Sequence, residues 1–138
     1  LAQVIVMAAA VSDFKRNRPI NKKISKELFL NSFLDDIAMT PDLIKNQTSR
    51  KLENQIFLGF AAETGSDNEI REKGEKKRIL KGCDLLMANP IDRDGQGFDK
   101  NFNSGFLLGP KKMVKNLSLA TKLSISHQLL DEIQNFKS

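Results

Sequence analysis

Three lysines at helical spacing are candidates for binding an anionic ligand. Lys73, Lys77 and Lys81 recur every four residues, so a helix places them on one face. Such a row of ammonium groups can face phosphates, and it can equally form a solvated surface. The same segment holds glutamates that balance its charge, namely Glu69, Glu72 and Glu75. Spacing alone therefore leaves both interpretations open.

A second group of lysines, Lys22, Lys23 and Lys26, lies in a polar segment over residues 12–27. A segment of this length without an apolar pattern predicts a mobile loop, followed by a short strand over residues 28–33. A lysine loop can close over a polyphosphate and neutralise its charge. A solvated loop without a ligand explains the composition as well.

Asp13 is the first carboxylate after the apolar segment that opens the chain. Mg²⁺ usually takes one or two protein carboxylates and completes its coordination with phosphates and water. Asp13 is therefore a candidate metal ligand. A turn aspartate that hydrogen-bonds its own backbone is the alternative.

Apolar runs predict the strands that must position these side chains. Residues 3–10 are apolar on both faces, which is the pattern of a central parallel strand covered by helices. Residues 55–61 and 85–88 predict two more buried strands. Residues 105–108 and 113–117, separated by a Gly-Pro turn, predict an antiparallel hairpin at one sheet edge.

Three helices alternate with these strands. Thr40 and Pro41 provide an N-cap hydroxyl and a proline at the first helical position. Ser66 opens a charged helix that runs to about Lys81 and ends at Gly82, and Thr121 caps a last helix. The predicted apolar faces are Leu43, Ile44 and Leu52 in the first helix, and Ile125, Leu129, Ile133 and Phe136 in the last. The alternation predicts a single α/β domain with a mostly parallel sheet.

In a parallel α/β sheet, ligands bind beyond the carboxyl ends of the strands. This rule selects the loop that follows the alanines at positions 8–10, the helix start at Thr40, and the turns over residues 61–64 and 88–90. The alanines are too small for ordinary core positions, so they leave room for a ligand against the backbone. Phe60 can stack on a base or fill the core.

Composition excludes several classes of protein. The chain has 138 residues, a net charge of +5, one cysteine and one histidine, which excludes a disulfide scaffold and a structural zinc cluster. The longest apolar run, residues 1–11, is about half of the ~20 residues of a membrane-spanning helix. No Walker A motif, GxGxxG motif or interleaved aromatic and basic series is present, so nucleic acid and membrane are not expected partners. We interpret Cys83 as a packing residue and His127 as a surface residue, and expect a cytoplasmic protein.

Several of these segments occur together in an order typical of one enzyme family. In sequence they are residues 8–14 (AAAVSDF), 23–26 (KISK), 40–43 (TPDL), 59–64 (GFAAET), 81–89 (KGCDLLMAN), Gly97 with Phe98, Asn103, and Thr121 with Lys122. The series resembles phosphopantothenoylcysteine synthetase, also called phosphopantothenate–cysteine ligase. In bacteria this enzyme is usually the C-terminal half of a bifunctional coenzyme A biosynthesis flavoprotein. The resemblance covers nearly the whole chain and implies a Rossmann-like, three-layer fold.

The family resemblance implies a reaction. The carboxylate of 4′-phosphopantothenate attacks the α-phosphate of CTP, which gives an acyl-cytidylate and pyrophosphate. The amine of cysteine then displaces CMP, and Mg²⁺ assists. FMN is implied only where a decarboxylase domain lies upstream in the parent protein, and a homodimer is implied for that parent.

The family's functional positions map onto this sequence. The backbone of Met7, Ala8 and Ala9 would face the cytosine, Asp13 would hold the metal and the nucleotide, and Lys23 would reach the triphosphate as the catalytic lysine. The helix start at Pro41, Asp42, Leu43 and Ile44 would face the nucleotide, Phe60 would contact it, and Lys77 and Lys81 would bind phosphate or ribose.

The sequence also departs from the family pattern. Ser25 replaces the middle lysine of the loop, Thr40 stands in place of the usual asparagine, and Pro90 stands in place of an aspartate. The family's glycine-rich loop and its asparagine segment are expected upstream of Leu1, so we expect residues 1–138 to be an incomplete ligase domain that is inactive alone. Two alternatives are a Rossmann-like module that binds a nucleotide or flavin without catalysis, and a regulatory domain with a degenerate site.

Overall fold

The computed structural model describes residues 2–18, 21–23, 25–27, 29, 36–95 and 100–137. The chain divides into two compact units. The larger unit comprises Leu1–Ala8 and Ile44–Ser138, and the smaller unit comprises Ala9–Leu43. In the part of the chain that the structure describes, no helix is both long and apolar enough to cross a membrane.

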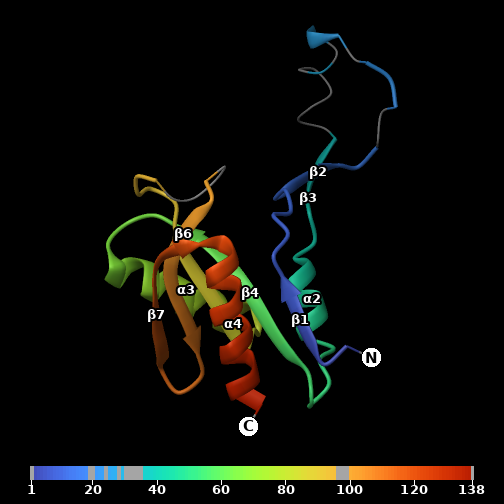
Figure 1. Ribbon diagram of the computed structural model, residues 1–138. Coiled ribbons are helices and arrows are strands. Elements are labelled where there is room, and N and C mark those ends of the chain that lie inside the picture. The colour runs from blue at the N-terminus through green and yellow to red at the C-terminus, as the bar shows by residue number, and fades with distance from the viewer. Residues whose placement is uncertain are drawn as a thin grey trace. The chain divides into compact units, whose positions relative to one another are not determined.

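A five-stranded sheet forms the centre of the larger unit (Figure 1). Its strands, in spatial order, are β1 (Val4–Met7), β4 (Ile56–Glu63), β5 (Leu85–Pro90), β6 (Phe102–Gly109) and β7 (Met113–Thr121). The first three run parallel, whereas β6 and β7 form an antiparallel hairpin beside β5. The predicted α/β fold with an antiparallel edge hairpin is confirmed.

Helices cover both faces of this sheet. On one face, α3 (Asp67–Lys81) buries Ile70 against Leu86, Phe106 and neighbouring residues. On the other face, α4 (Lys122–Lys137) lies over the hairpin, as Figure 1 shows. It packs its predicted apolar stripe of Ile125, Leu129, Ile133 and Phe136 against Leu58, Met87 and Leu107. The result is the expected three-layer arrangement.

The ends of α3 follow directly from local sequence. Ser66 accepts a hydrogen bond from the Glu69 amide, and the Glu69 carboxylate accepts one from the Ser66 amide at 2.8 Å, which forms a capping box. Gly82 ends the helix in the left-handed conformation, at φ 66°. The hydrogen bond from the Ser66 amide is the main cause that lowers the pKa of Glu69.

We expect Glu69→Gln to destabilise the chain at neutral pH but not in acid. Because the folded state lowers the pKa of Glu69, its contribution is complete above the ordinary glutamate pKa and is lost as the pH falls through the lowered value. Urea unfolding of both proteins across this pH range measures the difference. Glu72→Gln, at an exposed position of the same helix, is the control. A difference that does not depend on pH would contradict the assignment.

The smaller unit contains a two-stranded antiparallel ribbon of β2 (Phe14–Arg16) and β3 (Ile37–Met39). The predicted loop over residues 12–27 is therefore wrong at β2, and Lys26 and Glu27 are helical. The predicted strand over residues 28–33 lies outside the described residues except for Phe29. That residue is helical, and its amide donates to the Ser25 carbonyl at 2.9 Å.

Two predicted boundaries in the first half of the chain also differ. Strand β1 spans only Val4–Met7 and pairs with β4 alone among the described strands, so it is an edge strand and not a central one. Helix α2 (Leu43–Thr48) begins two residues after Pro41. The amide of Thr40 donates to the Asp13 carbonyl at 2.9 Å, so Thr40 continues the ribbon. Leu43 and Leu52 are exposed, and only Ile44 of the predicted face is buried.

Candidate functional site

The carboxyl end of β1 lies beside the middle of β4, where several candidate residues of the larger unit lie near one another. Met7 at the end of β1 pairs with Gly59 of β4, next to Phe60. A Cβ atom on Gly59 would lie 3.1 Å from Cδ1 of Ile44 and 3.0 Å from Sγ of Cys83. Glycine at this position therefore lets α2 approach β4 closely, and Ile44 is held there by packing.

Lys77 reaches the end of β4 from α3. Its Nζ lies 2.6 Å from Oε1 of Glu63, whose side chain is 9% exposed, while Lys77 itself is 45% exposed. Lys77 is therefore within ion-pair distance of a buried carboxylate oxygen. Lys77 thus lies at the predicted edge of the sheet and is paired with a carboxylate there.

Two other lysines of the predicted row have different surroundings. Nζ of Lys73 donates to the Thr64 carbonyl at 2.8 Å, so this side chain also extends towards the end of β4. The carbonyl of Lys81 accepts a hydrogen bond of 2.5 Å from Oγ1 of Thr48, which ties the last turn of α2 to the last turn of α3. The row predicted from spacing is confirmed as one helix, but its members engage different partners.

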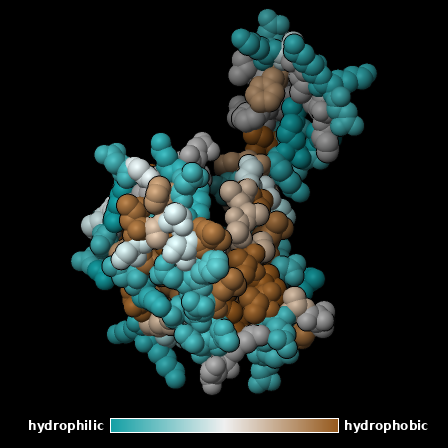
Figure 2. Space-filling view, in the orientation of Figure 1, coloured by the Kyte–Doolittle hydropathy of each residue, from teal (hydrophilic) through white to brown (hydrophobic). Residues whose placement is uncertain are grey.

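Phe60 faces away from the Glu63–Lys77 pair. Side chains alternate along β4, so Phe60 shares a face with Ile56 and Leu58, which pack towards α4, whereas Glu63 shares the opposite face with Ala61, which packs towards α3. Phe60 is 38% exposed, and Val6 of β1 is 44% exposed. Figure 2 shows apolar surface gathered beside α4, on the side of β4 and β1. Phe60 is therefore available to a ligand on this face and is not a core residue.

In the smaller unit, the ribbon brings Asp13 and Thr40 side by side through their backbones. Asp13, Pro41, Asp42 and the alanines at positions 9 and 10 are exposed, as is Lys23. No group of three or more His, Cys, Asp or Glu side chains gathers into a metal site among the described residues. One exposed carboxylate at Asp13 fits a magnesium ion that takes most of its ligands from phosphates and water.

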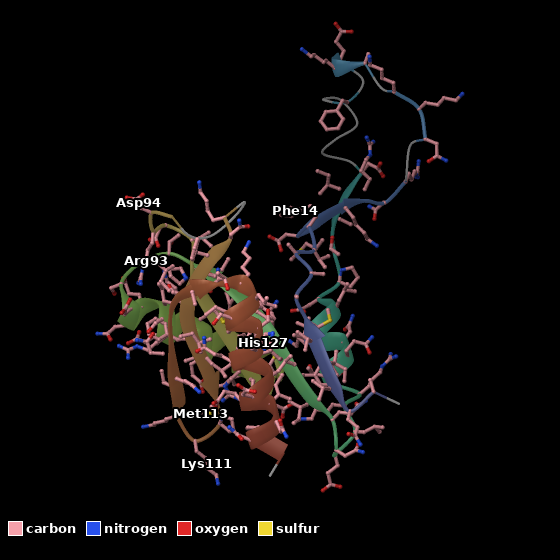
Figure 3. The ribbon with its side chains drawn as sticks, in the orientation of Figure 1. Phe14, Arg93, Asp94, Lys111, Met113 and His127 are labelled. Atoms are coloured by element: carbon pink, nitrogen blue, oxygen red, sulfur yellow. The ribbon has the colours of Figure 1, made fainter. Side chains whose placement is uncertain are left out.

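Sequence reasoning missed Glu63 and the contacts around the start of α3. The amide of Gly65 donates to Oδ2 of Asp92 at 2.9 Å, and Arg93 forms an ion pair with Asp67. These contacts join the loop after β5, where Figure 3 labels Arg93 and Asp94, to the first turn of α3. Strand alternation was the available signal for Glu63, because it lies two residues after the buried Ala61.

The remaining reactive side chains have the surroundings predicted for them. Cys83 is buried beside Gly59 and contributes to packing. His127 is exposed on α4, where it is labelled in Figure 3.

Comparisons with known proteins agree with this architecture. Solved structures share the fold: the C-terminal domain of coenzyme A biosynthesis bifunctional protein CoaBC aligns with a TM-score of 0.69 at 22% identity, covering 97% of this chain and 56% of that one. A DNA/pantothenate metabolism flavoprotein from Streptococcus pneumoniae aligns with a TM-score of 0.67 at 21% identity, covering 99% of this chain and 62% of that one.

Curated relatives share the sequence as well. The coenzyme A biosynthesis bifunctional protein CoaBC of Bacillus subtilis is 30% identical over 132 residues, which is 96% of this chain and 31% of that protein. The protein of the same name from Vibrio vulnificus is 34% identical over 134 residues, covering 95% and 32% respectively. The chain thus spans about a third of the length of these relatives. The family model for the DNA/pantothenate metabolism flavoprotein C-terminal domain matches residues 1–136, and the chain belongs to that family.

Proposed function

We propose that this chain is the CTP-binding part of a phosphopantothenate–cysteine ligase. The family match over residues 1–136 is the observation that supports it most strongly, together with relatives named for coenzyme A biosynthesis. The larger unit adds a physical argument, because α3 directs Lys73 and Lys77 to the end of β4. Cations at the carboxyl end of a parallel strand suit a phosphorylated ligand.

The proposed reaction depends on positioning and charge. A carboxylate oxygen of 4′-phosphopantothenate forms a bond to the α-phosphorus of CTP, and the bond to pyrophosphate breaks. The cysteine nitrogen then attacks the acyl carbon, CMP leaves, and the amine loses a proton. Negative charge accumulates on phosphate oxygens in the first step, so preorganised cations lower its barrier.

The proposed roles of the larger unit come from the family match, and its geometry supports Lys77 at the end of β4 but not Lys81, which lies in the last turn of α3 beside Thr48. Lys77 and Lys81 would bind phosphate or ribose, Phe60 would contact the nucleotide from the open sheet face, and the backbone of Met7 and Ala8 would face cytosine. Ile44 is buried by packing on Gly59 and would hold the start of α2 in place.

The proposed roles of the smaller unit rest on exposed polar groups. Asp13 would hold Mg²⁺, which supplies charge neutralisation when bound, and Lys23 would act on the triphosphate. Ala9, Pro41, Asp42 and Leu43 would present backbone to the nucleotide. The α2 helix has only six residues, so its dipole contributes less than the predicted longer helix would have done.

We expect the chain to bind Mg²⁺–CTP at least about tenfold more tightly than Mg²⁺–ATP or Mg²⁺–GTP, since a base-specific pocket discriminates through its polar groups. Titration calorimetry of the purified chain measures the affinities. Turnover is measured in a chimera in which this chain replaces the matching segment of Bacillus subtilis CoaBC, with release of pyrophosphate as the readout. Equal affinity for all nucleotides would contradict CTP recognition. Retention of yellow flavin by the purified chain would favour a non-catalytic flavin module.

A further inference from the structure

Glu63 and Lys77 form an ion pair that lacks a hydrogen bond. The Glu63 side chain is 9% exposed and Nζ of Lys77 is 2.6 Å from its Oε1. That oxygen is buried and accepts no hydrogen bond from any described residue. The Lys77 ammonium therefore meets this carboxylate at one oxygen, as a compact charge on a flexible stem.

Glu75 and Arg78, both in α3, form an ion pair with two hydrogen bonds. Nε of Arg78 donates to Oε2 of Glu75 at 2.7 Å, and Nη2 donates to Oε1 at 2.8 Å. These hydrogen bonds lower the pKa of Glu75 and raise the pKa of Arg78. Such bidentate geometry fixes both side chains. Glu63 and Lys77 have no comparable constraint.

Lys77 can reorient from the solvent side, and complete departure from Glu63 would cost the free energy of a buried, unpaired carboxylate. The Lys77 side chain is 45% exposed and carries a long, flexible stem. Lys73, one turn earlier, is engaged by the Thr64 carbonyl at 2.8 Å. Lys77 is accordingly the cation that can turn from a carboxylate to a bound phosphate at this end of β4.

We propose that Glu63 competes with bound phosphates for Lys77 and thereby limits the affinity of the domain for polyphosphates. The inference rests on the proposed function, in which Lys77 contacts phosphate. In the free domain the buried carboxylate neutralises the ammonium. A bound polyphosphate must share that ammonium with Glu63, and the Glu63 carboxylate also repels it. Both effects weaken polyphosphate binding and favour release of pyrophosphate.

The test uses inorganic tripolyphosphate as a probe without a base. We expect Glu63→Gln to bind tripolyphosphate about fivefold more tightly than the unchanged chain at low salt. A gain of this size is typical of removing one charge from a partly exposed ion pair. Lys77→Gln added to Glu63→Gln should remove the gain. Titration calorimetry measures the affinities, and thermal unfolding confirms that each variant folds.

Glu132→Gln is the matched control. Glu132 pairs with Lys115, and their side chains are 14% and 42% exposed, close to the values for Glu63 and Lys77. This pair links α4 to β7, on the opposite face of the sheet from α3. Its loss should leave tripolyphosphate affinity unchanged.

The inference would be overturned by weaker or unchanged binding in Glu63→Gln, by the same gain in Glu132→Gln, or by a gain that survives Lys77→Gln. Absence of tripolyphosphate binding in every protein would overturn it too. If Glu63→Gln does not fold, NMR of the unchanged chain decides the matter. Tripolyphosphate should then shift the Glu63 carboxyl resonance together with the Lys77 side-chain resonances, and leave those of Glu132 and Lys115 in place. Because the probe has no base, a failure of CTP preference is a separate outcome that tests only the proposed function.

Discussion

Gly105→Ala should lower the free energy of unfolding by about 3 kcal/mol or more, because overpacking and the loss of strand hydrogen bonds act together. A Cβ atom on Gly105 would stand 2.3 Å from the Ala88 carbonyl oxygen and 3.0 Å from the Asn89 Cα. Both are backbone atoms of β5, so no side-chain rotation relieves the clash. The residues that follow in β6 pair directly with β5, from Phe106 opposite Ala88 onwards. Separating the strands here would expose the centre of the sheet.

Gly95→Ala is the control for a glycine that is needed only for its backbone conformation. Gly95 has φ 77°, but no atom of the described residues lies within 4 Å of its Cβ position. We expect this variant to cost about 1 kcal/mol, the usual penalty for a left-handed alanine. Urea unfolding of the three proteins gives the comparison. A Gly105→Ala cost equal to that of Gly95→Ala would show that β5 and β6 can separate without loss.

Elements with local signals could be predicted from the sequence almost to the residue. The capping box at Ser66 and the left-handed Gly82 set the ends of α3 through contacts within a few residues. Thr121 likewise caps α4, accepting a hydrogen bond from the Ser124 amide at 3.2 Å. Local chemistry decides these boundaries because tertiary contacts do not compete for the same backbone groups.

Elements that depend on distant partners could not be predicted in the same way. Strands β2 and β3 have three residues each, too few to show a period of two, and their pairing joins Phe14 to Met39 across the sequence. The start of α2 was misplaced for the same reason. Thr40 has the right residue type for an N-cap, but it continues the ribbon beside Asp13, and α2 begins three residues later at Leu43.

The candidate site divides along similar lines. Four-residue spacing correctly placed Lys73, Lys77 and Lys81 on one helix. Spacing could not show that Lys77 meets a buried carboxylate, because this depends on how α3 packs against the end of β4. The sequence predicts a turn over residues 61–64, whereas strand β4 extends through Glu63 and places its side chain against Lys77 of α3.

Lys23→Gln should reduce turnover of the Bacillus subtilis chimera by about 10²–10³-fold, the size expected when one preorganised charge is removed from a transition state. The residue is exposed, so its loss should leave the free energy of unfolding unchanged to within about 0.5 kcal/mol. This separation of activity from stability distinguishes a catalytic cation from a structural one. Initial rates of pyrophosphate release and urea unfolding measure the two quantities.

Lys22→Gln is the matched control, since Lys22 is also exposed and precedes Lys23 directly. If the loop acted only through its total charge, the two variants would lose the same activity. The rate of pyrophosphate release would also become less sensitive to salt in both variants, and by the same amount. If Lys23 acts from a defined position, Lys22→Gln retains most of the turnover. Ser25 makes the comparison sharper, because the family's middle lysine is absent here and cannot mask the loss of Lys23. Equal losses would assign the function to the charge of the loop, and an unfolded Lys23→Gln would remove the case for catalysis by this residue.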